Sequence, residues 1–103
     1  MPKTDTQWRV FYTGKARKQK NRLPKQINAA LALLEFELKQ KGPELTNWPH
    51  YGKIKNKKDF FHCHLNNGRP RYVAVWKKNG DEINLIEVRY VGTHEGINYD
   101  RID

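Results

Sequence analysis

The chain has 103 residues, enough for one domain with a modest core but not for two. Its formal net charge of +9 favours a polyanionic partner, either nucleic acid or an acidic protein. The longest apolar run, residues 29–34, is far too short for a membrane span, and we expect no secretory signal. With a single cysteine, Cys63, no internal disulfide can form, so we expect a protein of the reducing cytoplasm.

The first half of the chain predicts one strand and one long helix. Residues 8–12 are aromatic and β-branched, which favours a strand, and the polar stretch 15–22 is either a short basic helix or a loop. Aliphatic side chains recur at three- and four-residue spacing from Pro24 to Lys41 and predict a helix, with Pro24 at its first position. Gly42-Pro43 would end this helix.

The second half predicts strands joined by hairpins, after a loop at 44–58 with a possible short strand at 51–55. Turn residues at 66–70 and Asn79-Gly80 separate the runs. The three strand-like runs are residues 60–65, 71–77 and 83–91. Strands joined by hairpins are antiparallel. The whole chain, 1–103, is therefore predicted to be one α+β domain with helices packed on a mainly antiparallel sheet.

Two histidines stand two positions apart in the first of these runs. Successive side chains on a strand point to opposite faces, so His62 and His64 should share one face of the sheet. The other face, toward the core, should receive Phe61, Cys63 and Leu65.

Metal-free RNA cleavage needs a base for the 2′-hydroxyl proton, positive charge for the phosphorane and an acid for the leaving 5′-oxygen. Imidazole can serve as base or acid near neutral pH, and arginine supplies charge. His62 and His64 would form a complete set with Arg71 and His94 if the fold brings them together. Tyr99 could stack on a base or position a phosphate.

Other interpretations of these residues remain open. The His-x-His pair could bind zinc with His94 or Cys63 as a third ligand, although Cys63 should point away. Either histidine could be an ordinary half-exposed surface residue. His50 lies in a loop, where it could contact substrate or simply form a turn.

Positive charge is concentrated in residues 1–22 and 51–79, whereas residues 80–103 are acidic overall. The two basic segments form one patch if the fold brings them together and two solvated faces if it does not. The residues expected to grip an RNA backbone are Lys15, Arg17, Lys18, Lys20, His50, Lys53, Lys55, Lys57 and Lys58.

Three segments, in this order of elements, resemble the RelE superfamily of bacterial toxins, most closely its HigB and YafQ branches. They are Phe61-His62-Cys63-His64-Leu65, Arg71-Tyr72-Val73-Ala74-Val75-Trp76 and Tyr90-Val91-Gly92-Thr93-His94-Glu95. The resemblance covers about residues 8–99. It implies the toxin of a type II toxin–antitoxin system, an mRNA interferase that cleaves mRNA on the ribosome, blocks translation and leaves a 2′,3′-cyclic phosphate. It further implies no metal or cofactor, and neutralisation by a cognate antitoxin that wraps the toxin.

The resemblance also places family positions on the candidates. RelE has lysines at the positions of His62 and His64, and an arginine that matches Arg71. The position of His94 holds an arginine in RelE and a histidine in the YafQ-like branch. Tyr99 best matches a near-terminal aromatic residue, and His50 matches an upstream loop histidine. The YafQ-like pattern has acidic groups near the first catalytic strand, which this chain lacks, so the resemblance does not identify the general base.

We therefore expect His64 and His94 to be the acid–base pair, in either order. His62 and Arg71 would stabilise charge, and Tyr99 would orient the substrate. Two rivals remain: a ParE-like toxin of the same fold that inhibits DNA gyrase without cleaving RNA, and a non-catalytic basic RNA-binding domain.

Overall fold

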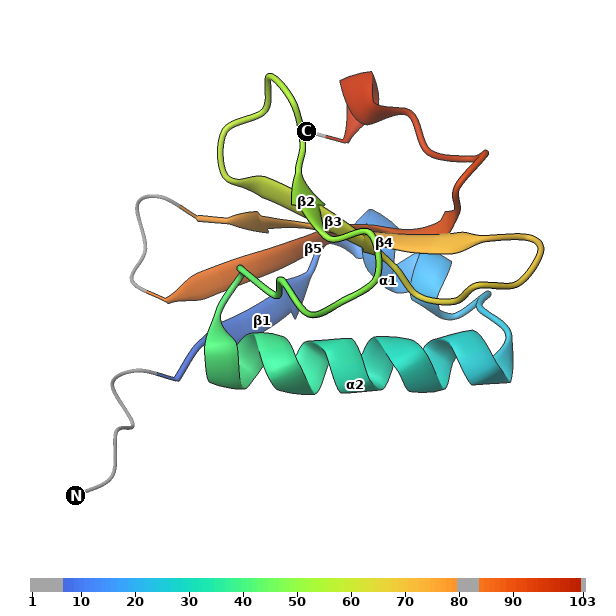
Figure 1. The fold of residues 1–103 in the computed structure, drawn as a ribbon, viewed down its shortest axis with the longest axis horizontal. Helices are drawn as coiled ribbons and strands as arrows, with labels where there is room; N and C mark the ends of the chain where they lie inside the picture. The colour runs from blue at the N-terminus through green and yellow to red at the C-terminus, as the bar shows by residue number, and fades with distance from the viewer. Residues whose placement is uncertain (1–6, 80–83, 103) are drawn as a thin grey trace.

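The computed structural model describes residues 7–79 and 84–102 (Figure 1). The strands form one sheet in the order β1-β5-β4-β3-β2. β1 runs parallel to β5, and the other neighbouring pairs are antiparallel. The elements are β1 (Arg9–Tyr12), α1 (Gly14–Lys20), α2 (Lys25–Lys41), β2 (Gly52–Lys53), β3 (Phe60–His64), β4 (Tyr72–Lys78), β5 (Leu85–Thr93) and the 3₁₀ helix η2 (Tyr99–Arg101).

The predicted α+β architecture is confirmed, and the strands begin and end within two or three residues of the predicted positions. Part of the predicted Asn79-Gly80 turn lies outside the described residues. The polar stretch after β1 is a helix rather than a loop. Pro24 is the N-cap of α2 and not its first helical residue, because its ψ of 153° is extended. As an N-cap it still precedes amide groups that lack helical partners.

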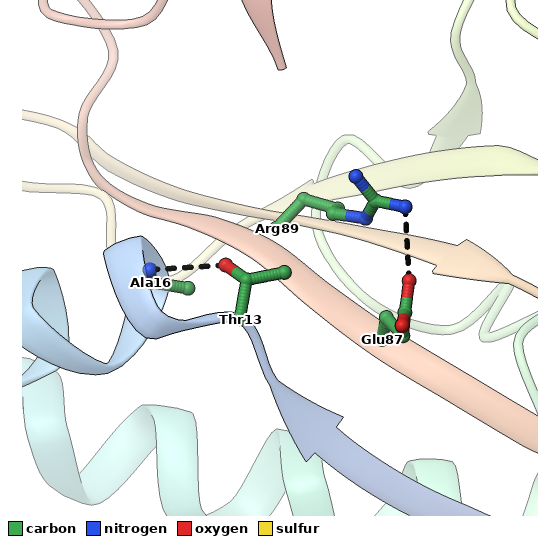
Figure 2. Close-up of polar contacts among 4 residues, drawn as sticks. All are labelled: Thr13, Ala16, Glu87 and Arg89. Carbon is green, nitrogen blue, oxygen red and sulfur yellow. Dashed lines mark hydrogen bonds and ion pairs between the residues drawn. The ribbon is translucent and has the colours of Figure 1, made fainter. Parts of the chain in front are cut away.

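α1 begins with a side-chain cap and continues the edge of the sheet that β1 starts. The Thr13 hydroxyl accepts a hydrogen bond from the Ala16 amide at 3.1 Å (Figure 2). Beyond the end of β1, the Val91 amide of β5 donates to the Gln19 side chain at 3.1 Å. A helix side chain thus satisfies an edge amide of β5 that has no strand partner there.

α2 covers one face of the sheet with the predicted aliphatic stripe (Figure 1). Gly42 ends the helix at a φ of 87°, and its amide donates to the Leu38 carbonyl at 2.9 Å. A side chain at Gly42 would also collide with Trp8, whose ring atoms lie 2.9 Å from an ideal Cβ position. The buried positions of the stripe are Ile27, Leu31, Leu34 and Leu38.

The opposite face of the sheet, which we call the distal face, carries a smaller cluster under the C-terminal segment. Phe60, Val75 and Ile102 are buried there, and Tyr90 and Tyr99 pack beside them. In Figure 1 the C-terminal segment, in red, lies on the side of the sheet away from α2. The sheet is therefore covered by helix on one face and only partly covered on the other.

A β-bulge in β5 changes which side chains reach the distal face. Val75 pairs with Tyr90, but Trp76 pairs with Val88, so Arg89 is an extra residue on β5. Val88 belongs to the core beneath α2, whereas Tyr90 packs in the distal cluster and the Arg89 guanidinium lies 5.8 Å from the Phe60 ring centroid. Two consecutive residues, Arg89 and Tyr90, therefore both serve the distal face.

None of the helices in the described part of the chain combines the length and apolar character needed to cross a membrane.

Two adjacent leucines of α2 provide a matched test of this packing. Leu34 is fully buried and Leu33 is 53% exposed. Leu34→Ala should lower the free energy of unfolding by about 2–5 kcal/mol, because it leaves a cavity. Leu33→Ala should lower it by less than about 0.5 kcal/mol. Urea denaturation of both variants measures the difference, and equal losses would contradict the assigned helix face.

Candidate active site

The ends of three neighbouring strands surround a hollow of about 300 Å³ on the protein surface. His64 ends β3, Arg71 immediately precedes β4, and His94 immediately follows β5, and all three line the hollow. The His94 amide donates to the Arg71 carbonyl at 2.7 Å, which fixes these two residues beside each other. The structure thus brings together side chains that are 30 residues apart in sequence.

The His64 ring contacts two other imidazole rings, those of His94, which also lines the hollow, and of His50, which lies beside it. The rings of His50 and His64 are stacked, with centroids 4.1 Å apart and an interplanar angle of 27°. The ring of His94 meets His64 edge-on, at 5.6 Å and 80°. The His64 amide donates to the Pro49 carbonyl at 2.9 Å, which ties the loop that carries His50 to β3. We call His50, His64 and His94 the histidine cluster.

His50 was predicted as an RNA contact or a turn residue, and the structure places it inside the cluster. Its φ is 53°, in the left-handed region that non-glycine residues seldom occupy. The neighbouring Tyr51 stacks on Phe61 in the core at 6.2 Å. Apart from the resemblance, the sequence carried no signal for this position, because a tertiary contact and not a local pattern sets the loop.

His62 and Tyr99 form the other side of the site. Their ring centroids are 6.3 Å apart at an angle of 66°. Gly52 lies opposite His62 in the sheet, and an ideal Cβ there would be 3.4 Å from the His62 Nε2 atom, so glycine leaves room for the ring. Tyr99 begins η2, and burial raises its pKa, so its hydroxyl keeps its proton at neutral pH.

Burial and mutual repulsion keep two of the imidazoles neutral near pH 7. Burial lowers the pKa of His64, and the positive charges of His50, Arg71 and His94 lower it further. Burial likewise lowers the pKa of His62, with a smaller contribution from His94. A neutral imidazole can accept a proton, which is what a general base must do.

The His64 ring is held by packing rather than by a hydrogen bond. Its Nδ1 atom is buried and has no hydrogen-bond partner among the described residues. Ring contacts with His50 and His94 orient it instead. The Nε2 and Nδ1 tautomers are therefore not distinguished by a protein acceptor, in contrast to triads where a carboxylate selects one of them.

Cys63 lies on the face opposite the histidines, as predicted. It is fully buried in the core beneath α2 with Phe61 and Leu65, and burial raises its pKa to about 12. It therefore cannot act as a zinc ligand together with His62 and His64. Across the described residues, no group of three or more His, Cys, Asp or Glu side chains is arranged to hold a metal ion.

The two basic segments flank the sheet rather than meet. α1 contacts β5 and β1 at one edge, whereas β2 and the loop after it form the other edge. Between them, the Phe60 ring on the distal face collects three cations, at 5.4–6.0 Å from its centroid. These cations are Lys57, Lys77 and Arg89, of which the last two were not predicted as site residues.

The lowered pKa values of His62 and His64 predict a pH-dependent stability. The unfolded chain binds protons at the usual histidine pKa of about 6.5, but the folded chain resists protonation until lower pH. The free energy of unfolding should therefore fall as pH decreases from 7 toward 5. Urea denaturation across this range should show a shallower slope for His62→Gln/His64→Gln than for the wild type. Equal slopes would contradict the proposed charge repulsion.

Solved structures of bacterial and archaeal toxins share this fold, although no protein-family model and no curated protein sequence matches the chain. A mutant of the E. coli toxin RelE in the free state superposes with a TM-score of 0.67 at 16% identity, covering 86% of this chain and 85% of that chain. The YoeB dimer from Staphylococcus aureus superposes with a TM-score of 0.67 at 14% sequence identity. The match covers 85% of this chain and 98% of that chain.

A RelB–RelE antitoxin–toxin complex from Methanococcus jannaschii provides a third match. It gives a TM-score of 0.65 at 23% identity and covers 88% of this chain and 96% of that chain. These matches span nearly the full length of chains of similar size, so the likeness concerns the whole architecture and not one motif. The described chain therefore has the fold of the RelE and YoeB toxins.

Proposed function

We propose that the chain is the toxin of a type II toxin–antitoxin system and acts as a ribosome-dependent mRNA endoribonuclease of the HigB- and YafQ-like kind. The observation that carries this proposal is the convergence of two imidazoles, His64 and His94, and the Arg71 guanidinium on a single hollow of a strongly basic molecule, with His50 stacked on His64 beside it. The RelE-type fold supports it, because the catalytic candidates come from the strand ends that the fold brings together.

His64 is assigned as the general base. Its pKa is lowered, so at neutral pH it is unprotonated and can take the 2′-hydroxyl proton. The 2′-oxygen then attacks the adjacent phosphorus, and the bond to the leaving 5′-oxygen breaks. His94 is exposed at the rim of the same hollow, and it is assigned as the acid that protonates the 5′-oxygen. The products are a 2′,3′-cyclic phosphate and a free 5′-hydroxyl.

The remaining site residues stabilise and orient the phosphate. The Arg71 guanidinium supplies the positive charge for the phosphorane. His62, which is neutral at pH 7, contributes a hydrogen bond rather than a charge. His50 holds the His64 ring by stacking, and Tyr99 offers its ring and hydroxyl to the nucleotide. The reaction needs no metal ion, because the base, the acid and the charge all come from side chains.

The proposed partners are mRNA and ribosomal RNA on the ribosome, and a cognate antitoxin. Lysines and arginines at the two edges of the sheet would contact RNA phosphates on either side of the distal face. The Methanococcus jannaschii and Pyrococcus horikoshii structures that share the fold are complexes of RelE with RelB, which supports an antitoxin partner. A toxin that acts on translating ribosomes works in the cytoplasm.

Replacing the acid or the base tests the catalytic assignment. His64→Ala and His94→Ala should each reduce mRNA cleavage on programmed ribosomes by about 10²–10⁴-fold, because each removes one proton transfer. Lys25→Ala, on α2 beneath the opposite face, should cleave at the wild-type rate. Primer extension on the mRNA measures the cleavage, and circular dichroism checks that each variant is folded.

The same variants separate the two rivals. A gyrase-inhibiting toxin of this fold would relax or block DNA supercoiling and tolerate loss of the histidines. A plain RNA-binding domain would bind ribosomes without producing cut mRNA. Wild-type cleavage by both His64→Ala and His94→Ala would show that the nuclease site is wrongly assigned.

A further inference from the structure

A second hollow, of about 280 Å³, lies where α1, β5 and the C-terminal segment meet. Its walls come from three parts of the chain that are distant in sequence. We call it the basic hollow, because three cations line it together with neutral polar side chains. The cations are Lys15, Arg89 and Arg101, and the neutral groups are Thr13, Gln19, Tyr90 and Asn98. No acidic side chain among the described residues lines it.

Arg89 is a fixed, mostly buried cation in this wall. Its side chain is only 20% exposed, its Nη2 atom donates to Glu87 Oε1 at 2.9 Å (Figure 2), and its guanidinium lies over the Phe60 ring. Its Nε atom is buried with no hydrogen-bond partner. Glu87 balances the charge of the guanidinium, but the buried Nε–H group remains available to a further acceptor.

The other two cations add positive charge that no described side chain pairs with. Within residues 7–79 and 84–102, neither Lys15 nor Arg101 forms an ion pair with a described side chain. Among the described residues, Lys15, Arg89 and Arg101 with Glu87 leave a surplus of two positive charges around the basic hollow. Such a concave, positively charged surface concentrates anions.

The chemistry of the lining suits a phosphate group. Guanidinium and ammonium groups together form the usual charge-assisted contacts to phosphate oxygens. The Gln19 Oε1 atom accepts a hydrogen bond from the Val91 amide, so the Nε2 group of Gln19 is available as a further donor. A volume of about 280 Å³ is at the lower end of small-molecule pockets, so it has room for a phosphate with its sugar.

The basic hollow lies within reach of an RNA strand bound at the histidine cluster. His62 pairs with Val75, which pairs with Tyr90, and Tyr90 lines the basic hollow. Two strand spacings are about 10 Å. The C-terminal segment also connects the two places, because Tyr99 contacts His62 while the adjacent Asn98 lines the basic hollow.

We propose that the basic hollow binds a second phosphate of the mRNA strand, near the scissile phosphate but separate from it. This inference rests on the proposed nuclease function and adds a substrate subsite to it. Arg89 and Arg101 contribute to substrate binding, not to proton transfer. The subsite fixes where the strand enters the active site, so it acts on kcat/KM for the correctly positioned mRNA.

Neutral backbone linkages in the mRNA provide the test. One methylphosphonate is placed in turn at each phosphate flanking the cut site, and cleavage on programmed ribosomes is measured. For the wild-type protein, one flanking position should lower kcat/KM about tenfold, since a charge-assisted phosphate contact is lost there. Lys15→Gln/Arg101→Gln should lower kcat/KM about tenfold with ordinary mRNA and show no further loss at that position.

The matched control also removes one lysine and one arginine, but at positions away from the basic hollow. Arg22→Gln/Lys25→Gln changes the turn between α1 and α2, and it should keep the wild-type sensitivity at the flanking position. Two results would overturn the subsite and leave the nuclease proposal intact. In the first, the wild-type protein cleaves mRNA but loses no kcat/KM with a methylphosphonate at any flanking position. In the second, Lys15→Gln/Arg101→Gln loses as much kcat/KM at that position as the wild type. Absence of any wild-type cleavage would instead overturn the proposed function.

Two further outcomes would identify a different occupant. Titration with inorganic phosphate and with a 5′-mononucleotide, followed by NMR of the arginine side chains, measures binding of free phosphates. Tight nucleotide binding without a sensitive mRNA linkage would assign the basic hollow to a free nucleotide and contradict our proposal. Loss of antitoxin binding in Lys15→Gln/Arg101→Gln, with the linkage sensitivity retained, would assign it to an acidic protein segment.

Discussion

The packing of β3 against α2 is the constraint on which the site depends. Because Phe61, Cys63 and Leu65 are buried beneath the helix, the strand must direct His62 and His64 to the distal face. The register then places His64 opposite Val73, and Val73 opposite Gly92. Arg71 lies two residues before Val73, and His94 lies two residues after Gly92. Hydrophobic packing on one face of the sheet therefore determines which polar side chains meet at the ends of β3, β4 and β5.

The histidine cluster combines a lowered His64 pKa with a loss of stability at low pH. Burial, and repulsion by the neighbouring imidazoles and the Arg71 guanidinium, lower the pKa of His64, so the fold holds this ring neutral at the cost of stability at low pH. In the proposed mechanism, the same lowered pKa leaves His64 free to act as a base near neutral pH. An unpartnered Nδ1 atom and a strained His50 backbone are further signs that local stability is sacrificed here.

Sequence periodicity predicted most of the fold. The aliphatic stripe of α2, the alternation in β3 and the hairpin order of β3 to β5 are local patterns, and each was confirmed. The parallel pairing of β1 with β5 was not predicted, because it joins the two ends of the chain and leaves no local signal. The bulge at Arg89 was also missed, since the prediction assumed strict alternation through β5.

The site was predictable as far as strand alternation and the RelE resemblance reach. They indicated His62, His64, Arg71 and His94. The structure brings His64, Arg71 and His94 together at one hollow and places His62 against Tyr99, although their catalytic roles remain a proposal. The position of His50 depends on how a loop docks onto β3, and the basic hollow depends on the C-terminal segment folding back over the distal face. Neither follows from periodicity, because both arise from contacts between distant segments.

The chemical identity of the cut ends tests the central claim most directly. mRNA cleaved on ribosomes by the purified protein can be analysed by mass spectrometry of the two fragments. Attack by the 2′-oxygen predicts a 2′,3′-cyclic phosphate on the upstream fragment and a 5′-hydroxyl on the downstream one. A 3′-hydroxyl with a 5′-phosphate, or cutting that persists when the nucleotide before the cut lacks its 2′-hydroxyl, would contradict a histidine-driven transfer.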